Sequence, residues 1–188
     1  RDSFAVYMML DGRMTLSWDK GTETVDRGET VLLPACIEEI GLDLEAKNIG
    51  LAYFNYADED VQIIADPEQL KRVVNNIVGN SVKYLDKQKG FINIRIKDVG
   101  DFIQVEIEDN GRGIAARDLP YIFDRFYRAD ASRNSATGGS GIGLSIVKKI
   151  IEDHGGKIWA TSKESIGTVM YFVLRKYQEV PYEQSIDH

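Results

Sequence analysis

The chain has 188 residues, of which 43% are hydrophobic, and a formal net charge of −7. This is enough material for one sizeable core, and the acidic balance argues against binding of nucleic acid. No apolar run is long enough to span a bilayer and no signal peptide opens the chain, so we expect no membrane contact by these residues. The single cysteine, Cys36, excludes an intrachain disulfide and favours a reducing compartment. Because Arg1 rather than Met opens the chain, we expect it to be a piece of a longer protein.

Residues 1–33 predict short β-strands. Turn signals stand at Asp11-Gly12, Lys20-Gly21 and Arg27-Gly28, and β-prone residues flank each of them. Residues 34–48 then predict a helix, with Pro34 suited to its first turn. The stretches 49–56 and 61–66 predict two further strands.

The next predicted helix begins at Asp66-Pro67, an N-cap followed by a proline at the first helical position. Its apolar residues recur at helical spacing and predict a face toward the core: Leu70, Val73, Val74, Ile77, Val78 and Leu85. A polar stripe, Asn76, Asn80, Lys83 and Tyr84, falls on a neighbouring flank. Asparagine is a poor helix former, so this stripe is either a solvated helix border or part of a site.

Two strands follow as a hairpin. Ile92, Ile94 and Ile96 alternate with polar residues, and the second strand alternates in the same way after the turn "DVGD". Continued by its period of two, the second strand turns Asp109 toward the apolar face, where a carboxylate needs a hydrogen-bond donor. The alternative is that "DNG" forms a turn that returns Asp109 to water.

The last third of the chain alternates loops with regular elements. An irregular stretch carrying Phe123 and Phe126 leads into "RADASRNSATGGSG", which predicts a mobile loop. A helix over 142–154 follows, closed by Gly155-Gly156. Two final strands, "KIWATS" and "TVMYFVLRK", are joined at Gly167, and a polar tail begins near residue 178. We expect Trp159 in the core and His154 to be a charged imidazolium that stabilises the helix end.

Three glycine clusters stand around the helix that carries the two asparagines: "DNGRG" at 109–113, "GGSGIGL" at 138–144 and "GT" at 167–168. The second cluster runs into a helix N-terminus, where free amides and the helix dipole favour phosphate. It is neither a P-loop nor a dinucleotide fingerprint, because the lysine motif and the preceding strand are both missing.

In this order and spacing the motifs resemble those of the ATP-binding catalytic domain of sensor histidine kinases, within the Bergerat-fold ATPases that include gyrase B and Hsp90. "NNIVGNSVKY" resembles the N box of that family, "EDNGRGI" and "GGSGIGLSIVKKIIEDHGGKIWATS" its two glycine boxes, and "IFDRFYR" its F box. The resemblance implies a two-layer α/β (α+β) sandwich, with a mixed sheet covered by helices on one face. It divides the chain into a lead-in (1–33), the catalytic domain (34–176) and a tail (177–188).

The resemblance also implies ATP and Mg²⁺ as cofactors and a role for each polar position. Asn80 would present its amide oxygen to Mg²⁺, and Asn76 would support the metal's hydration shell. Lys83 would contact phosphate and Tyr84 would pack beside the adenine. Arg128 would reach the γ-phosphate during transfer. The asparagine stripe would then be a metal-binding shelf.

For the base and the phosphates the resemblance implies a further set of contacts. The carboxylate of Asp109 would accept from the adenine amino group. The remaining positions that would contact the nucleotide are Gly111, Gly113, Ile114, Gly139, Gly141, Ile142, Gly143, Leu144 and Thr168.

The chain lacks the phosphate-accepting histidine motif of such kinases. We therefore expect the γ-phosphoryl group to go to a histidine on a separate dimerisation domain, with a response regulator downstream, in the cytoplasmic part of a membrane-anchored bacterial sensor. Two alternatives are a non-catalytic nucleotide-sensing module and an ATP-hydrolysing relative of gyrase B and Hsp90. Hydrolysis is disfavoured, because those relatives place a glutamate base where Asn76 stands.

The lead-in departs from the kinase pattern. "DSFAVYMMLDGRMTLSWDKGTETVDRGETVLLPA" resembles the closing strands of a cupin, especially the C-terminal part of bacterial mannose-6-phosphate isomerases. It is too short for a complete barrel and contains no histidine that could bind a metal. Whether it is a fused foreign segment or an incidental β-rich lead-in stays open.

Overall fold

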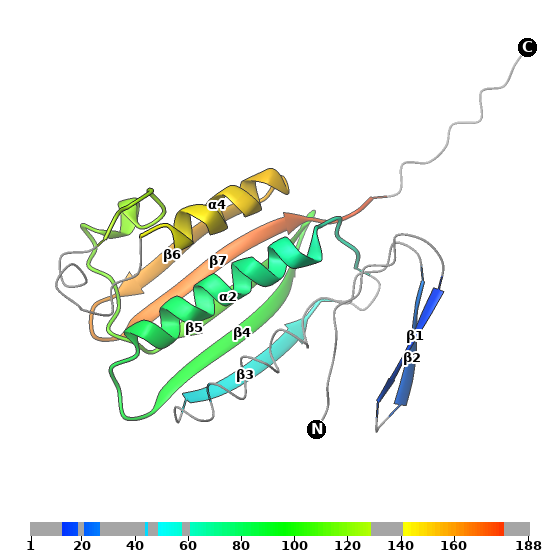
Figure 1. The fold of residues 1–188 in the computed structure, drawn as a ribbon, viewed down its shortest axis with the longest axis horizontal. Helices are drawn as coiled ribbons and strands as arrows, with labels where there is room; N and C mark the ends of the chain where they lie inside the picture. The colour runs from blue at the N-terminus through cyan, green and yellow to red at the C-terminus, as the bar shows by residue number, and fades with distance from the viewer. Residues whose placement is uncertain are drawn as a thin grey trace, which may run out of the picture.

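The computed structural model describes residues 13–18, 21–26, 44, 49–57, 61–128 and 141–178. Most of them form a five-stranded sheet with two helices on one face (Figure 1). In chain order its elements are β3 (Ile49–Tyr56), α2 (Pro67–Tyr84), β4 (Gly90–Val99), β5 (Phe102–Asp109), the short 3₁₀ helix η1 (Leu119–Tyr121), α4 (Gly143–Asp153), β6 (Lys157–Lys163) and β7 (Gly167–Arg175). The strand order is β3-β4-β5-β7-β6, with β3 and β4 parallel and the other pairs antiparallel. The predicted two-layer fold with a mixed sheet is confirmed.

Two strands of the lead-in are described, β1 (Arg13–Trp18) and β2 (Gly21–Asp26), and they pair antiparallel with each other. Of the helix predicted over 34–48, only Leu44 is described; it is helical and buried. The predicted loop over 129–140 and the tail after residue 178 lie outside the described residues.

Helix α2 forms where the sequence predicts it. The side chain of Asp66 accepts hydrogen bonds from the backbone amides of Glu68 and Gln69, at 2.9 and 3.1 Å, and Pro67 occupies the first turn. These contacts satisfy amides that have no partner inside the helix. The helix buries one face against the sheet: Leu70, Val73, Val74, Ile77, Val78 and Ser81. The polar stripe consequently lies beside the core, along one edge of the helix.

The inner face of the hairpin completes the core. Ile92, Ile94 and Ile96 of β4 are buried beneath the helices, as alternation predicts. Asp109 is the last residue of β5 and pairs with Ile92, so it faces the same side of the sheet. The alternative, in which a turn returns Asp109 to water, is wrong.

Two predictions about β structure are wrong. Residues 61–66 form no strand but an extended segment, with one isolated bridge between Ile63 and Lys176. Its alternation is real, because Ile63 and Ala65 are buried while Ile64 is exposed, but a strand also needs a neighbour along its length. Trp159 is half-buried rather than in the core; it stacks on Tyr171, with ring centroids 5.3 Å apart.

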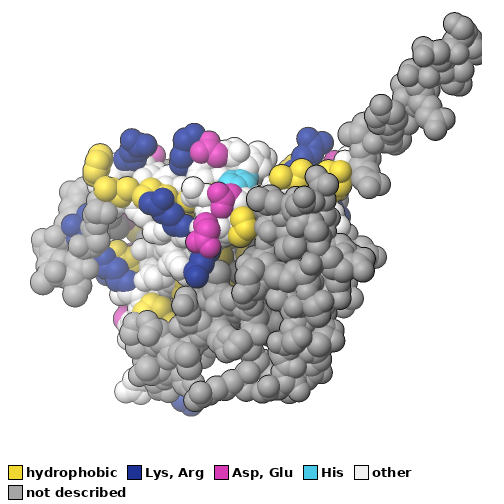
Figure 2. All heavy atoms as spheres, turned by 45° about the vertical axis from the view of Figure 1, so that its right-hand side comes forward, with side chains coloured by type: hydrophobic (Ala, Val, Ile, Leu, Met, Phe, Trp, Pro, Cys, Tyr) yellow, Lys and Arg dark blue, Asp and Glu magenta, His cyan; other side chains and the backbone are white. Residues whose placement is uncertain are grey.

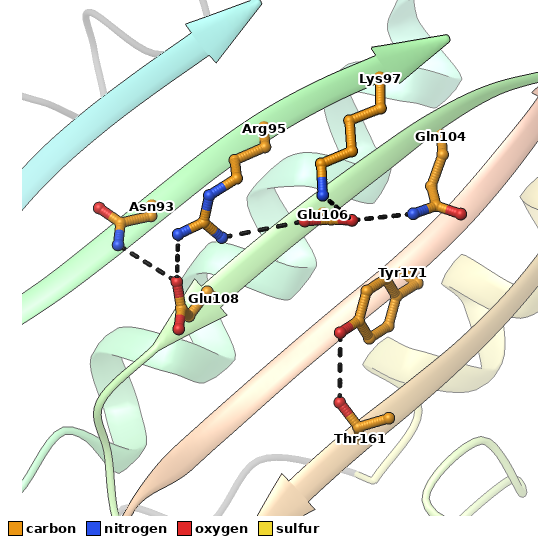
Figure 3. Close-up of polar contacts among 8 residues, drawn as sticks. All are labelled: Asn93, Arg95, Lys97, Gln104, Glu106, Glu108, Thr161 and Tyr171. Carbon is orange, nitrogen blue, oxygen red and sulfur yellow. Dashed lines mark hydrogen bonds and ion pairs between the residues drawn. The ribbon is translucent and has the colours of Figure 1, made fainter. Parts of the chain in front are cut away.

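The sheet face opposite the helices carries a polar network (Figure 3). Arg95 donates to Glu108 at 2.6 Å, and Asn93 donates to the same carboxylate at 3.2 Å. Glu106 is only 7% exposed, yet it accepts from Lys97 at 2.7 Å and from Gln104 at 2.8 Å. The charges on this face thus neutralise one another across β4 and β5.

The end of α4 is tied to the start of α2 through His154. Its Nδ1 donates to the carbonyl of Ile150 at 2.7 Å, and its Nε2 accepts from the amide of Asp66 at 3.0 Å. A ring that accepts at Nε2 is neutral, so the expected imidazolium is corrected to a neutral link between two helix ends. Gly155 follows with φ +69, the predicted left-handed cap.

Acidic and basic side chains are interspersed over the described part of the face shown in Figure 2.

Candidate functional site

A cavity of about 540 Å³ opens between α2, the N-terminus of α4 and the loop after β5. Figure 1 shows the lower end of α2 and the start of α4 on the same side of the sheet. Twelve of the residues predicted for the site line this cavity: Asn76, Asn80, Lys83, Tyr84, Asp109, Gly113, Ile114, Arg128, Gly141, Gly143, Leu144 and Thr168. Sequence positions separated by up to 92 residues therefore line one cavity.

Asp109 is held by two donors at the floor of the cavity. Its Oδ2 accepts from the hydroxyl of Ser81 at 2.8 Å, and its Oδ1 accepts from the amide of Gly111 at 2.9 Å. A carboxylate offers about four acceptor positions, so two remain for a ligand. One of the hydrogen-bond donors that Asp109 requires at its inward position is thus supplied by Ser81 of α2.

The polar stripe of α2 forms one wall. Asn76 donates its amide Nδ2 to the carbonyl of Arg72 at 2.8 Å. Its Oδ1 lies 3.0 Å from the place where a side chain on Gly143 would begin. Asn76 and Gly143 therefore meet where α2 approaches the N-terminus of α4, a position that suits an anion.

Tyr84 closes the wall at the end of α2. The guanidinium carbon of Arg112 lies 4.4 Å from the centroid of its ring, and the ammonium nitrogen of Lys83 lies 5.3 Å from it. The backbone joins the same group, because the amide of Arg112 donates to the carbonyl of Tyr84 at 3.1 Å. Both cations attract the ring face and bring positive charge to the cavity wall.

Two glycines are required by close approach of the backbone. Gly113 has φ +73, and a Cβ there would lie 2.1 Å from the carbonyl oxygen of Lys163. Gly141 has φ +70, and a Cβ there would lie 3.0 Å from backbone atoms of Phe126 and Tyr127. Both positions favour glycine by conformation and by space.

Arg128 follows a tightly held turn. Phe126 has a left-handed backbone, φ 64, and its amide donates to the carbonyl of Gly141 at 3.0 Å. The hydroxyl of Tyr127 donates to Asp118 at 2.6 Å, and Asp118 is 8% exposed. This turn therefore delivers Arg128 to the cavity on a fixed backbone.

Two of the predicted site residues that the structure describes do not line the cavity, and a third lies outside the described residues. Gly111 lies behind Asp109, where a Cβ would meet the carbonyl of Tyr84 at 2.7 Å. Ile142 is the N-cap residue of α4, and its carbonyl accepts from Ser145. Gly139 lies outside the described residues.

The cavity also contains residues that the sequence reasoning missed: Ile77, Ser81, Arg112, Ala115, Arg117, Asp118, Ile122, Tyr127, Glu164, Ser165 and Met170. Ser81 could have been found, because it lies eleven residues after Leu70 on the buried face of α2, where a hydroxyl needs a partner. No sequence pattern pairs Tyr127 with Asp118 or brings the 164–165 turn to this surface.

The side chains around the cavity suit a metal ion whose ligands are mainly water and phosphate oxygens rather than protein atoms. Among the described residues no group of three or more His, Cys, Asp or Glu side chains could hold an ion. Asn80 lines the cavity with an amide, and a neutral oxygen ligand is compatible with Mg²⁺, which keeps several waters and binds substrate phosphates. The residues present therefore fit a magnesium ion that arrives with a phosphate ligand.

Comparisons with known proteins agree with this geometry. The model of the family described as "Histidine kinase-, DNA gyrase B-, and HSP90-like ATPase" matches residues 65–178. The sensor histidine kinase WalK of Bacillus subtilis (strain 168) is 35% identical over 127 residues, which are 66% of this chain and 21% of WalK. The sensor protein kinase WalK of Staphylococcus aureus is 40% identical over 111 residues, which are 58% of this chain and 26% of that protein. The chain thus spans about a fifth to a quarter of these relatives.

Solved structures of histidine kinases share the fold of this chain. The catalytic domain of the histidine kinase ThkA has a TM-score of 0.64 and 30% sequence identity, covering 75% of this chain and 88% of that one. The mycobacterial sensor histidine kinase MprB, at 24% identity, has a TM-score of 0.64 over 77% of this chain and 95% of its own and supports the fold alone. The matched family, the shared fold and the cavity lined by its motifs together show that this chain belongs to the histidine kinase-, DNA gyrase B- and HSP90-like ATPases, as a catalytic domain of the histidine kinase type.

Proposed function

We propose that the chain binds Mg²⁺-ATP and transfers the γ-phosphoryl group to a histidine on a dimerisation domain that these residues do not include. The observation that carries this proposal is that the base-contacting and phosphate-contacting residues line one shared cavity. The carboxylate of Asp109 and the polar side chains of α2, Asn76, Asn80 and Lys83, line the same space. ATP is the ligand that matches both regions, because it joins a base with an amino group to a polyphosphate.

The residues have distinct roles in this proposal. The adenine amino group donates to Asp109, which already accepts from Ser81 and Gly111 at two of its other acceptor positions. Tyr84, with Arg112 and Lys83 over its ring, packs beside the base and the sugar. Gly141 and Gly143 bring the amides at the start of α4 toward the phosphates.

Mg²⁺ would be held by the amide oxygen of Asn80, with Asn76 supporting its waters, and would supply charge neutralisation between the phosphates. In the transfer itself the bond from the γ-phosphorus to the bridging oxygen breaks, and a bond to an imidazole nitrogen of the acceptor forms. ADP leaves and the imidazole proton goes to solvent. Arg128 stabilises charge on the moving group, and Asn76 cannot act as a base on water, so hydrolysis stays slow.

The relatives extend the proposal to the whole protein. The named relatives are sensor kinases of bacteria, so we infer a dimerisation domain as the immediate partner and a response regulator after it. The chain would then be the cytoplasmic catalytic part of a membrane-anchored sensor. Among the described residues no helix is long and apolar enough to span a bilayer, which is compatible with a catalytic part that lies outside the membrane.

Transfer of label from radiolabelled ATP tests the proposal. With Mg²⁺ alone the chain should bind ATP and remain unlabelled; adding a compatible dimerisation domain should give an acid-labile, base-stable phosphohistidine on that domain. Asn80→Ala should abolish transfer, and Arg128→Ala should slow it more than it weakens ATP binding. Acid-labile labelling of His154 in the isolated chain would show that transfer does not need a second domain.

A further inference from the structure

The direction of a hydrogen bond at the cavity floor can be deduced by counting protons. The hydroxyl of Ser162 lies 2.8 Å from the carbonyl oxygen of Gly167 and 2.9 Å from the hydroxyl of Thr168. It also accepts from the amide of Ile114 at 2.8 Å. A carbonyl can only accept, so the one proton of Ser162 goes to Gly167.

The hydroxyl of Thr168 must therefore donate to Ser162. Ser162 then makes one donated and two accepted bonds, which is all that a serine hydroxyl can make. Thr168 is 7% exposed and lines the cavity. With its proton committed to Ser162, its oxygen presents only lone pairs to a ligand.

Asp109 lies beside it with the same polarity. The two residues are direct partners across β5 and β7, and paired Cα atoms of antiparallel strands are only about 4.5–5.5 Å apart. Both side chains point to the helix side of the sheet and line the cavity. Asp109 in turn receives the protons of Ser81 and Gly111.

We propose that Ser162 and Ser81 are positioning residues that make this floor a pair of acceptors, Asp109 and Thr168, and so select a base with an exocyclic amino group over one with a carbonyl. An amino group has two N–H bonds and can satisfy both acceptors at once. A carbonyl oxygen in the same place would face two sets of lone pairs. The inference deepens the proposed function, on which it rests, by assigning base selection to residues behind the contact surface.

The test compares ATP with inosine triphosphate, which differs by carrying a carbonyl in place of the amino group and a proton on the neighbouring ring nitrogen. The wild-type chain should prefer ATP by at least about 100-fold in Kd, measured calorimetrically with Mg²⁺. Ser162→Ala frees the Thr168 hydroxyl to donate into the cavity, so the preference should fall about 5- to 10-fold, the net value of one hydrogen bond. A purely structural effect would weaken both nucleotides equally and leave the preference unchanged.

A second variant keeps the test decisive if Ser162→Ala does not fold. Thr168→Val keeps the shape and the strand preference of the side chain but removes the acceptor, so it should weaken ATP about 5- to 10-fold and leave inosine triphosphate unchanged. Ser81→Ala should also lower the preference, because Asp109 loses one of the two donors that orient it.

Thr161→Val is the matched control. Thr161 neighbours Ser162 on β6, but it faces the opposite side of the sheet, where its hydroxyl meets that of Tyr171 at 3.4 Å (Figure 3). This variant should leave the preference as in the wild type. The inference is overturned if the wild type binds both nucleotides alike, or if Ser162→Ala and Thr168→Val both keep the full preference. A chain that selects ATP in this way but transfers no phosphoryl group refutes the proposed function and supports the inference.

Discussion

At the scale of single residues, the site depends on side chains whose hydrogen bonds are set from behind. Asp109 illustrates this, because its position at the end of β5 turns it inward and its two protein donors hold it there. An unpaired carboxylate in such a place would carry a large desolvation cost. The same arrangement leaves two acceptor positions for a ligand, so folding and binding place compatible demands on this residue.

Asp109→Asn should keep the fold and lose most of the affinity for ATP. The amide has one acceptor oxygen, which the Gly111 amide can occupy, while its NH₂ group can turn to the Ser81 hydroxyl. The ligand then loses a charge-assisted hydrogen bond worth about 1.5–3 kcal/mol, or roughly 10- to 150-fold in Kd. Titration calorimetry measures the affinity, and an unchanged thermal melting curve confirms the fold. An affinity within about a factor of two of the wild type would contradict the role of Asp109.

At the scale of elements, the sequence predicted those parts whose cause is local. Helix α2 has its cap, its proline and its apolar spacing within one stretch, so its start and buried face were correct. The inward turn of Asp109 followed from the alternation of β5 alone. Residues 61–66 alternate correctly but have no strand beside them along their length, which depends on distant residues.

The parts of the site that were missed have the same explanation. Thr168 is predicted, but its partner Ser162 is not, because the two are separated by a turn and the direction of their hydrogen bond depends on the carbonyl of Gly167 and the amide of Ile114. Trp159 is predicted for the core, but its strand places it on the opposite face of the sheet, against Tyr171. Contacts of this kind join residues that are distant in the sequence, so the periodicity of the sequence does not predict them.

The outer face of the sheet should contribute pH-dependent stability through Glu108. Burial raises the pKa of Glu108, but hydrogen bonds from Arg95 and Asn93 and the charge of Arg95 outweigh burial, so the pKa lies below its ordinary value of 4.5. The folded state therefore favours the ionised form, and this stabilisation is present above pH 4.5 and lost as the pH falls through the lowered value. The pair is partly exposed, so its net contribution is at most about 1 kcal/mol.

Glu108→Gln should accordingly lower the free energy of unfolding by up to about 1 kcal/mol at pH 7, with the difference shrinking toward pH 3. Urea unfolding at both pH values measures it. Glu152→Gln is the control, because Glu152 is an exposed residue of α4 whose ion pair with Lys148 spans 4.0 Å. A wild-type advantage over Glu108→Gln that grows on acidification would contradict the assigned sign.

At the scale of the whole molecule, the domain extends further toward the N-terminus than the family match at residues 65–178. Strand β3 (Ile49–Tyr56) pairs with β4 along its full length. Leu44 is 1% exposed and belongs to the same core as Leu70 and Ile92. The sheet and its core thus need residues from at least Leu44 onward, whereas β1 and β2 pair only with each other among the described strands.

The proposed boundary between residues 33 and 34 is compatible with these contacts and can be tested with two truncations. Removal of residues 1–33 should leave ATP affinity within about two-fold of the full chain, because no described residue of the lead-in lines the cavity. Removal of residues 1–48 also deletes Leu44, and loss of a buried leucine costs about 2–5 kcal/mol. This longer truncation should therefore melt at a clearly lower temperature. Calorimetric titration and thermal unfolding of both variants measure the two effects. A truncation at residue 33 that folds but no longer binds ATP would place the lead-in within the site and move the boundary of the catalytic domain to the start of the chain.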